Sequence, residues 1–437
     1  MSSVPGNQDV WRIAAPMILS NISVPLLGMV DTGVIGHLDD AVYLAAVAIG
    51  ATIFGFLYTG VNFLRMGTTG IAAQCYGAND YDGLRVALGQ AIIVALGIAS
   101  ALLVLQAPLA AMALDVLGAG DQVTAYAREY FSIRIWSAPA TLTNYALMGW
   151  FLGLQNARVP LYIAMAINLT NIALDLVLVV GLGYKVDGVA AASVIAEFTG
   201  LAVGLAFVFG ELKRHPGQWL RYRFTRFREY AGFFAINGHL LIRTLSLMFT
   251  FAFVTAQGAR LGGLILAANA VLMNLQHLLS FVLDGLAHAA EALVGKAVGS
   301  KNRDALHRAV ALTLRWSLYL SVGFSLAYAI GGQYLVRVLT DLPDVRATTF
   351  EYLPWLVLLP VVSVWSFLYD GVYVGATRAR AMRDIMIMST FLVFLPSWFA
   401  LRSFGNHGLW LAFTLFMASR GIGMHVYYRR KILVAAS

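Results

Sequence analysis

Long apolar stretches alternate with short polar ones along almost the whole chain. Several stretches exceed the roughly 20 residues that a helix needs to cross a bilayer, for example residues 88–114 and 231–255. Strand-like alternation of apolar and polar positions does not separate them, and within hydrocarbon only helices or closed barrels satisfy their own backbone groups. The pattern therefore predicts an all-α polytopic membrane protein.

Breaks at glycine, proline and charged residues divide the chain into twelve predicted transmembrane helices. Their approximate ranges are 10–36, 43–73, 84–108, 122–153, 157–181, 189–210, 231–257, 262–296, 305–332, 349–376, 382–402 and 408–428. The longest polar stretch, residues 211–230, lies between the sixth and seventh spans and is rich in arginine. We therefore expect an N-terminal six-helix lobe at 1–210, a basic cytoplasmic linker at 211–230, and a C-terminal six-helix lobe at 231–437.

Basic residues are unequally shared between the loops on the two sides of the predicted bundle. The side without the termini holds only Arg128, Lys185, Arg260, Arg337, Arg346 and Arg402, and most others lie on the opposite side. Because loops rich in lysine and arginine stay in the cytoplasm, we expect both termini to be cytoplasmic and the chain to lie in a bacterial-type cytoplasmic (inner) membrane. These loops account for the net charge of +8, so we expect no nucleic-acid partner.

The two halves repeat each other at a constant offset of 222 residues, with Gly77 aligned to Gly299 and Gly153 to Gly375. Each half has an even number of predicted spans, so both halves start on the same side and form a parallel repeat. Two lobes of this kind typically hold a central substrate site and alternate its access by rocking. A duplicated channel or scaffold is the alternative interpretation.

The composition agrees with this architecture, because only 12% of the residues are charged where a soluble chain has about a quarter. The N-terminus lacks the pattern of a cleavable signal, and the single cysteine, Cys75, excludes a disulfide within the chain. Nucleotide-binding loops, zinc motifs and nucleophile elbows are absent from the sequence. We therefore expect neither an enzyme nor a cofactor or structural metal, and we expect an ion gradient to supply the energy.

Two aspartates lie inside predicted spans of the first lobe. Asp31 is five residues before the expected end of span one, and Asp175 is six before that of span five. At 1.5 Å per residue both lie about 8–9 Å inside the same membrane face. Asn168, Asn171 and Asp175 share a helix face by their spacing. Carboxylates at membrane depth usually serve an ion or substrate, and the repeat places Phe253 and Ser397 at the corresponding positions of the second lobe.

The second lobe has its own polar residues within predicted spans. On span eight, His277, Asp284, His288 and Glu291 share a helix face by their spacing. Arg243 in span seven is a candidate partner for Asp284 or for Asp370 in span ten. This set is either a structural ion pair or a route for protons or cationic substrate, and the residues alone leave both interpretations open.

Several motifs resemble those of the multidrug and toxic compound extrusion (MATE) transporters, in particular the DinF-like branch. They are APMILSN at 15–21, VPLLGMVDT at 24–32, IGHL at 35–38, LRMGTTG at 64–70, GARLG at 258–262, NAVLM at 269–273, LDG at 283–285 and GATRA at 375–379. The resemblance implies a MATE/MOP-type fold in which family members export cationic and amphipathic compounds in exchange for H⁺ or Na⁺.

The resemblance also implies roles for individual residues. Asp31 matches a first-span aspartate that couples cation entry to export, and Asn171 and Asp175 match a pair in span five. Ser193 stands where the family has a hydroxyl near that site, and Pro16 matches a proline linked to bending of the first span. The acidic residues that another branch uses in spans seven and ten are not evident, and span seven carries Arg243 instead.

We therefore expect a secondary transporter that exports small cationic or amphipathic molecules by antiport with H⁺, with Na⁺ as the less favoured coupling ion. We expect a monomer whose partners are the lipid bilayer and these substrates. A lipid or lipid-linked oligosaccharide flippase of related architecture is the alternative within transport. A non-transporting membrane scaffold is the alternative outside it, although no loop is long enough for a soluble reader domain.

Overall fold

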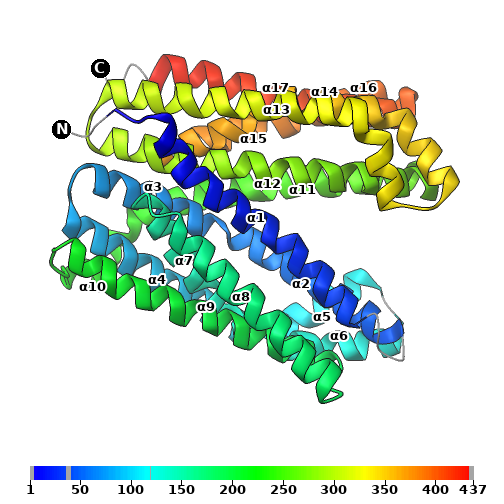
Figure 1. The fold of residues 1–437 in the computed structure, drawn as a ribbon, viewed down its shortest axis with the longest axis horizontal. Coiled ribbons are helices and arrows are strands. Elements are labelled where there is room, and N and C mark those ends of the chain that lie inside the picture. The colour runs from blue at the N-terminus through cyan, green and yellow to red at the C-terminus, as the bar shows by residue number, and fades with distance from the viewer. Residues whose placement is uncertain (1–3, 36–40, 119, 433–437) are drawn as a thin grey trace. The chain divides into compact units, whose positions relative to one another are not determined.

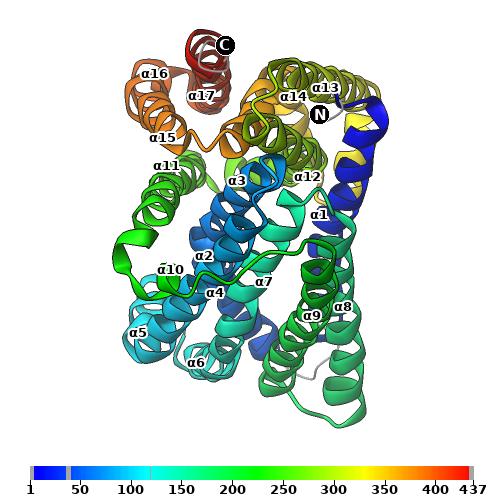
Figure 2. The same cartoon turned by 90° about the vertical axis from the view of Figure 1, so that its left-hand side faces the viewer.

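The computed structural model describes residues 4–35, 41–118 and 120–432, which form helices joined by short turns and loops, with no strand among them (Figures 1 and 2). The α-helices of the first half are α1 (Asn7–Ile35), α2 (Ala41–Val61), α3 (Phe63–Gly77), α4 (Tyr81–Val104), α5 (Gln106–Leu117), α6 (Asp121–Arg134), α7 (Ala138–Gly153), α8 (Arg158–Asp175), α9 (Val186–Arg214) and α10 (Tyr222–Thr225). Those of the second half are α11 (Ala231–Leu261), α12 (Gly263–Gly299), α13 (Arg303–Leu339), α14 (Pro343–Gly375), α15 (Ala379–Met388), α16 (Leu395–Leu401) and α17 (Gly405–Tyr427).

Nine helical stretches of the described residues are long and apolar enough to cross a membrane. One of them, Ala379–Ile432, is 54 residues long and turns back near Gly405, whose φ is +56°, so it holds the eleventh and twelfth predicted spans. The remaining two predicted spans, the first and the fourth, correspond to the 29-residue helix α1 and to the stretch Asp121–Gly153. The protein is an all-helical membrane protein with the expected twelve spans.

Several spans are interrupted where proline prevents a regular helix, because its ring clashes with the carbonyl four residues earlier. Pro108 follows the end of α4 at Val104, and Pro139 follows the 3₁₀ turn Ile135–Ser137 between α6 and α7. Pro396 follows the π-helical turn Ser389–Phe394. A second π-helical turn, Leu176–Gly181, comes directly after Asp175, and such turns are frequent at functional sites.

The described chain forms two compact units. One consists of Leu19–Gly232, which includes the linker, and the other of Phe233–Ser437 together with Met1–Ile18. The expected division placed all of span one in the first lobe, whereas α1 contributes to both units. Its early residues pack on α12 and α13: a Cβ atom at Gly285 would lie 2.3 Å from Ile18 Cγ1, and Trp11 meets Trp316 edge-on at 5.2 Å.

Glycines allow the closest helix contacts inside each unit. In the first unit, a Cβ atom at Gly149 of α7 would lie 2.4 Å from the backbone oxygen of Arg65 in α3. In the second unit, a Cβ atom at Gly371 of α14 would lie 2.2 Å from the backbone oxygen of Ala287 in α12. Close backbone approach of this kind is the usual way in which membrane helices associate.

The linker 211–230 is held against the first unit. Arg85 of α4 donates to the backbone oxygens of Leu212 at 2.8 Å and His215 at 3.2 Å, which are acceptors left unpaired at the end of α9. Gln90, one turn further along α4, donates to the backbone oxygen of Glu229 at 3.2 Å. The stretch between the sixth and seventh spans is therefore anchored to α4.

Candidate functional site

The polar residues of α8 lie on its protein-facing side, as their spacing predicts. Asp175 is fully buried, and the exposed fraction of Asn171 is only 1%. Asp175 is also the last residue of α8 before the π-helical turn. A carboxylate completely enclosed at membrane depth is costly unless a proton, a cation or a hydrogen-bond donor stabilises it.

Ser193 of α9 lies beside this pair. The amide nitrogen Nδ2 of Asn171 donates to Ser193 Oγ at 3.5 Å. The other amide atom, Asn171 Oδ1, is buried and has no hydrogen-bond partner among the described residues. An amide oxygen, a hydroxyl oxygen and a carboxylate are all ligands for small hard cations and acceptors of hydrogen bonds, and the carboxylate can also bind a proton.

Asn168 joins α8 to the first helix, because its Nδ2 atom donates to the backbone oxygen of Ser23 at 3.2 Å. As the first and fifth spans, α1 and α8 run in the same direction. Asp31 is eight residues beyond Ser23 and Asp175 is seven beyond Asn168, so their backbones reach nearly the same level at 1.5 Å per residue. The side chain of Asp31 lies outside the described residues.

Pro16 lies inside α1, two residues before the point where this helix passes from one compact unit to the other. Proline in a helix frees the carbonyl four residues earlier and permits a bend. This position is compatible with the conformational role that the resemblance implies, and that role remains a prediction.

A second charged group inside the first unit was missed by the sequence analysis. Glu197 of α9 accepts a hydrogen bond from Asn144 Nδ2 of α7 at 3.1 Å, and its Oε1 atom is 3.9 Å from Arg134 Nη2 of α6. Both charged residues lie within predicted spans, so a search for ionisable residues at membrane depth would have found them. Their partnership depends on three helices and has no signature in the sequence.

The second unit contains a buried ion-pair cluster. Asp370 of α14 accepts hydrogen bonds on Oδ2 from Arg243 of α11 and, at 2.8 Å, from Arg420 of α17. The exposed fractions are 8% for Arg243, 8% for Asp370 and 2% for Arg420. Arg243 therefore contacts Asp370, one of its two candidate partners, and Arg420 is a partner that the sequence analysis missed.

The four polar residues predicted on one face of span eight have different environments on α12. His288 and Glu291 are buried and lie 3.5 Å apart, measured from Nδ1 to Oε1. Asp284 attracts Arg420 electrostatically, whereas His277 is exposed and faces the ring of Phe251 at 6.1 Å. The structure thus connects Asp284, but not His277, with the buried cluster.

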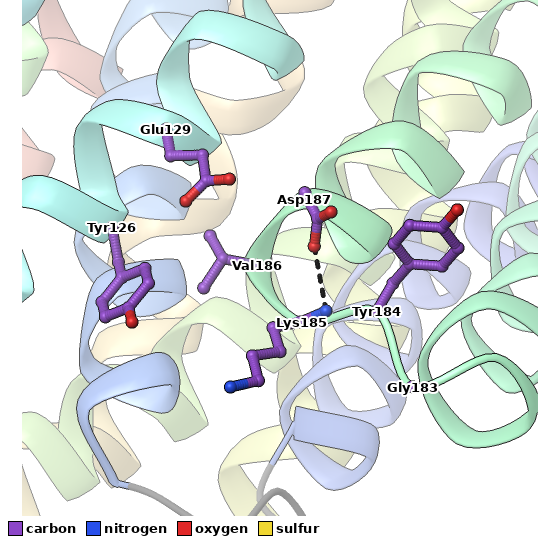
Figure 3. Close-up of a pocket in the computed structure, with 7 residues that line it drawn as sticks. All are labelled: Tyr126, Glu129, Gly183, Tyr184, Lys185, Val186 and Asp187. Carbon is purple, nitrogen blue, oxygen red and sulfur yellow. Dashed lines mark hydrogen bonds between the residues drawn. The ribbon is translucent and has the colours of Figure 1, made fainter.

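A separate pocket of about 260 Å³ opens where the turn before α9 meets α6 (Figure 3). It is lined by Tyr126, Glu129, Gly183, Tyr184, Lys185, Val186 and Asp187. Its base is held in place because Lys185 Nζ donates to Tyr43 Oη at 2.5 Å and Asp187 Oδ1 accepts from the Lys185 backbone N–H at 2.9 Å. The pocket contains none of the predicted site residues.

Comparison with known proteins identifies a family model that matches both halves of the chain. A family model described as MatE matches residues 16–177 and again 240–399. The two matches fall on the two halves, in agreement with the internal repeat.

Individual relatives and solved structures match nearly the full length. The DNA damage-inducible protein F of Escherichia coli is 42% identical over 427 residues, which are 97% of this chain and 92% of that protein. A probable multidrug resistance protein NorM of Bradyrhizobium diazoefficiens is 26% identical across 95% of this chain and 92% of that protein. A crystal structure of MATE in the bent conformation matches with a TM-score of 0.90 at 17% identity. The match covers 98% of this chain and 96% of the chain in that structure.

Proposed function

This chain belongs to the MATE family of membrane transporters, and we propose that it exports cationic or amphipathic small molecules by antiport with H⁺. The family resemblance of its motifs, its helical fold and the expectation of a transporter rather than an enzyme are confirmed. The coupling ion, the substrate class, the inner-membrane location and the cytoplasmic position of both termini belong to the proposal.

The observation that carries the proposal is the complete burial of Asp175 beside Asn171 and Ser193 in the first unit. Low-dielectric surroundings favour the neutral form of a carboxyl group, and a second carboxylate nearby favours it further. Asp31, whose backbone reaches the same level on α1, is the candidate second carboxylate. Such a pair is suited to take up a proton on one side of the membrane and release it on the other.

In the proposed cycle, the ionised carboxylates attract a cationic substrate from the cytoplasmic side. Protonation of Asp31 and Asp175 on the opposite side removes the charge that held the substrate, so the substrate leaves. The two six-helix lobes then alternate access and the protons are released inward. A ligand shifts the equilibrium between the two access states only if it binds one state more tightly than the other. The change in charge at the carboxylates supplies this difference in affinity.

We expect Asp175→Asn to abolish proton-driven export of ethidium from proteoliposomes, because asparagine cannot exchange a proton. Asp115→Asn, at an exposed carboxylate of α5, is the matched control and should export normally. The assay compares a pH gradient with a Na⁺ gradient of the same size. Undiminished proton-driven export by Asp175→Asn would refute the coupling role, and export by the wild type under the Na⁺ gradient alone would assign the site to Na⁺.

A further inference from the structure

Glu197 lies in the interior of the first unit and is contacted from two other helices. It is eleven residues into α9, about 16 Å from the start of that helix at 1.5 Å per residue. Asn144 of α7 donates both to its carboxylate at 3.1 Å and to its backbone oxygen at 3.0 Å. The mechanism proposed above does not use this carboxylate.

Polar side chains from three neighbouring helices surround Glu197. They are Tyr58 from α2, Arg134 from α6, and Thr141, Asn144 and Tyr145 from α7. Tyr130 of α6 adjoins Arg134, and Ser137 is hydrogen-bonded to Tyr58. Arg65 of α3 lies within electrostatic reach of Tyr145. The positive charge nearest to Glu197 is that of Arg134.

The contact between Glu197 and Arg134 is too loose for a purely structural ion pair. The distance from Arg134 Nη2 to Glu197 Oε1 is 3.9 Å, whereas charge-assisted hydrogen bonds of this kind are usually about 2.7–2.9 Å long. A buried pair compensates for the loss of hydration only when its geometry is close and its remaining atoms are hydrogen-bonded. The mutual attraction of this pair is therefore weaker than that of a direct charge-assisted hydrogen bond, although removing one partner would still leave the other charge buried.

Asn171 and Ser193 lie between Asp175 and Glu197 along the two helices α8 and α9. Asp175 and Asn171 are four residues apart on α8, and Ser193 and Glu197 are four apart on α9, so each pair lies on one helix face. The hydrogen bond from Asn171 to Ser193 at 3.5 Å joins the two helices. The series thus has a carboxylate at each end and neutral oxygens between them.

Two buried acceptor atoms, one in this series and one beside Glu197, have no hydrogen-bond partner among the described residues. They are the amide oxygens of Asn171 and Asn144, and each of these residues has an exposed fraction of 1%. An unpaired buried acceptor is costly and is stabilised by a cation or a proton donor. The unpaired atoms and the two carboxylates therefore suit the same kind of ligand, a small cation.

We propose that Glu197 is a second cation-exchanging carboxylate of this lobe, which receives the coupling ion from Asp175 by way of Asn171 and Ser193. When the ion is a proton, Asp175 loses one proton and becomes an anion, and Glu197 gains one and becomes neutral. Arg134 stabilises Glu197 in its ion-free state. The inference rests on the proposed antiport at Asp175 and extends it by a second exchange step.

The test uses the full-length protein in proteoliposomes, with ethidium as the transported probe. Glu197→Gln should lose ion-gradient-driven export but keep gradient-independent exchange of ethidium between the two sides, since exchange needs no ion transfer. Because this variant leaves Arg134 without a counter-charge and can fail to fold, the double variant Glu197→Gln/Arg134→Gln is measured as well. It removes both charges and should also exchange ethidium without gradient-driven export.

Gradient-driven export at the wild-type rate by either variant would overturn the inference, because the pair would then be structural only. Infrared spectroscopy of the protonated carboxyl band gives an independent readout without substrate. Part of this carboxyl band should titrate with pH or disappear on addition of Na⁺, and we expect Glu197→Gln to remove that part. The response to Na⁺ shows whether the exchanged ion is H⁺ or Na⁺. An unchanged band would mean that Glu197 stays ionised, which contradicts the proposal.

The outcomes for Glu197 and for the proposed function are separable. If Asp175→Asn exports normally while Glu197→Gln does not, the coupling role of Asp175 is refuted, and ion transfer from Asp175 to Glu197 is refuted as well. If Asp175→Asn loses export and Glu197→Gln retains it, only the further inference fails. Asp115→Asn serves as the control in both arms.

Discussion

The buried cluster around Asp370 allows a quantitative test of the second unit. Asp370 is the acceptor for both Arg243 and Arg420, and both of its hydrogen bonds are on Oδ2. Replacing Asp370 with asparagine therefore leaves two buried guanidinium groups without their shared anion. Arg420 would keep its contacts with Met417 Sδ at 3.4 Å and with the ring of Phe416 at 5.3 Å, and the more distant attraction of Asp284.

The expected size of the effect follows from this geometry. Removing one partner of a buried ion pair typically costs about 3–5 kcal/mol because the other charge remains buried. Arg243→Gln should cost less, about 1–3 kcal/mol, since Asp370 keeps its hydrogen bond to Arg420. The loss of stability in the double variant Asp370→Asn/Arg243→Gln should be smaller than the sum of the two single losses by about 0.5–3 kcal/mol, as expected for residues in one network.

The free energy of unfolding can be measured for each variant by titration with sodium dodecyl sulfate in mixed micelles, followed by tryptophan fluorescence. Asp341→Asn is the matched control, because Asp341 pairs with Arg346 at 2.7 Å but is fully exposed. It should unfold like the wild type, since exposed ion pairs contribute little. The reasoning would be refuted if Arg243→Gln cost as much as Asp370→Asn, because Asp370 would then not neutralise both arginines.

Two further predictions concern packing and use the same unfolding titration. Gly371→Ala should destabilise the second unit by about 1–3 kcal/mol, because the added Cβ atom would lie 2.2 Å from the Ala287 backbone oxygen. Gly323→Ala on α13, where nothing lies within 4 Å, should be neutral or slightly stabilising, and equal effects would contradict the packing. Asn269→Leu should cost about 1–3 kcal/mol, because Asn269 exchanges two hydrogen bonds with Asn406; a neutral result would contradict this pairing.

The elements that could be predicted best are those that depend on the bilayer. The spans follow from apolar length alone, because every backbone group in hydrocarbon must be paired within its helix. The face shared by Asn168, Asn171 and Asp175 follows from helical periodicity. In the structure Asn168 contacts α1, Asn171 contacts α9, and Asp175 is buried. The exception is α1, where the distribution of its residues between two units depends on the packing of Gly285 rather than on hydropathy.

Partnerships between helices could not be predicted in the same way. Arg243 had two candidate partners, and the choice of Asp370 together with Arg420 depends on how α11, α14 and α17 pack. Glu197 and Arg134 could each be found as charged residues within predicted spans, but their proximity depends on how α6, α7 and α9 pack together. Neither arrangement has a local pattern in the chain.

The amino-acid sequence alone therefore determined the helical class and the internal repeat, because these depend on apolar length and on residue spacing along the chain, and it predicts a common membrane depth for Asp31 and Asp175. Only the tertiary structure decided which charges neighbour one another. It placed Ser193 beside Asn171, gave Asp370 two arginines, and added Glu197 to the polar interior of the first unit. The physical reason is that electrostatic partnership depends on distances of a few ångströms between different helices, and those distances arise only when the helices pack.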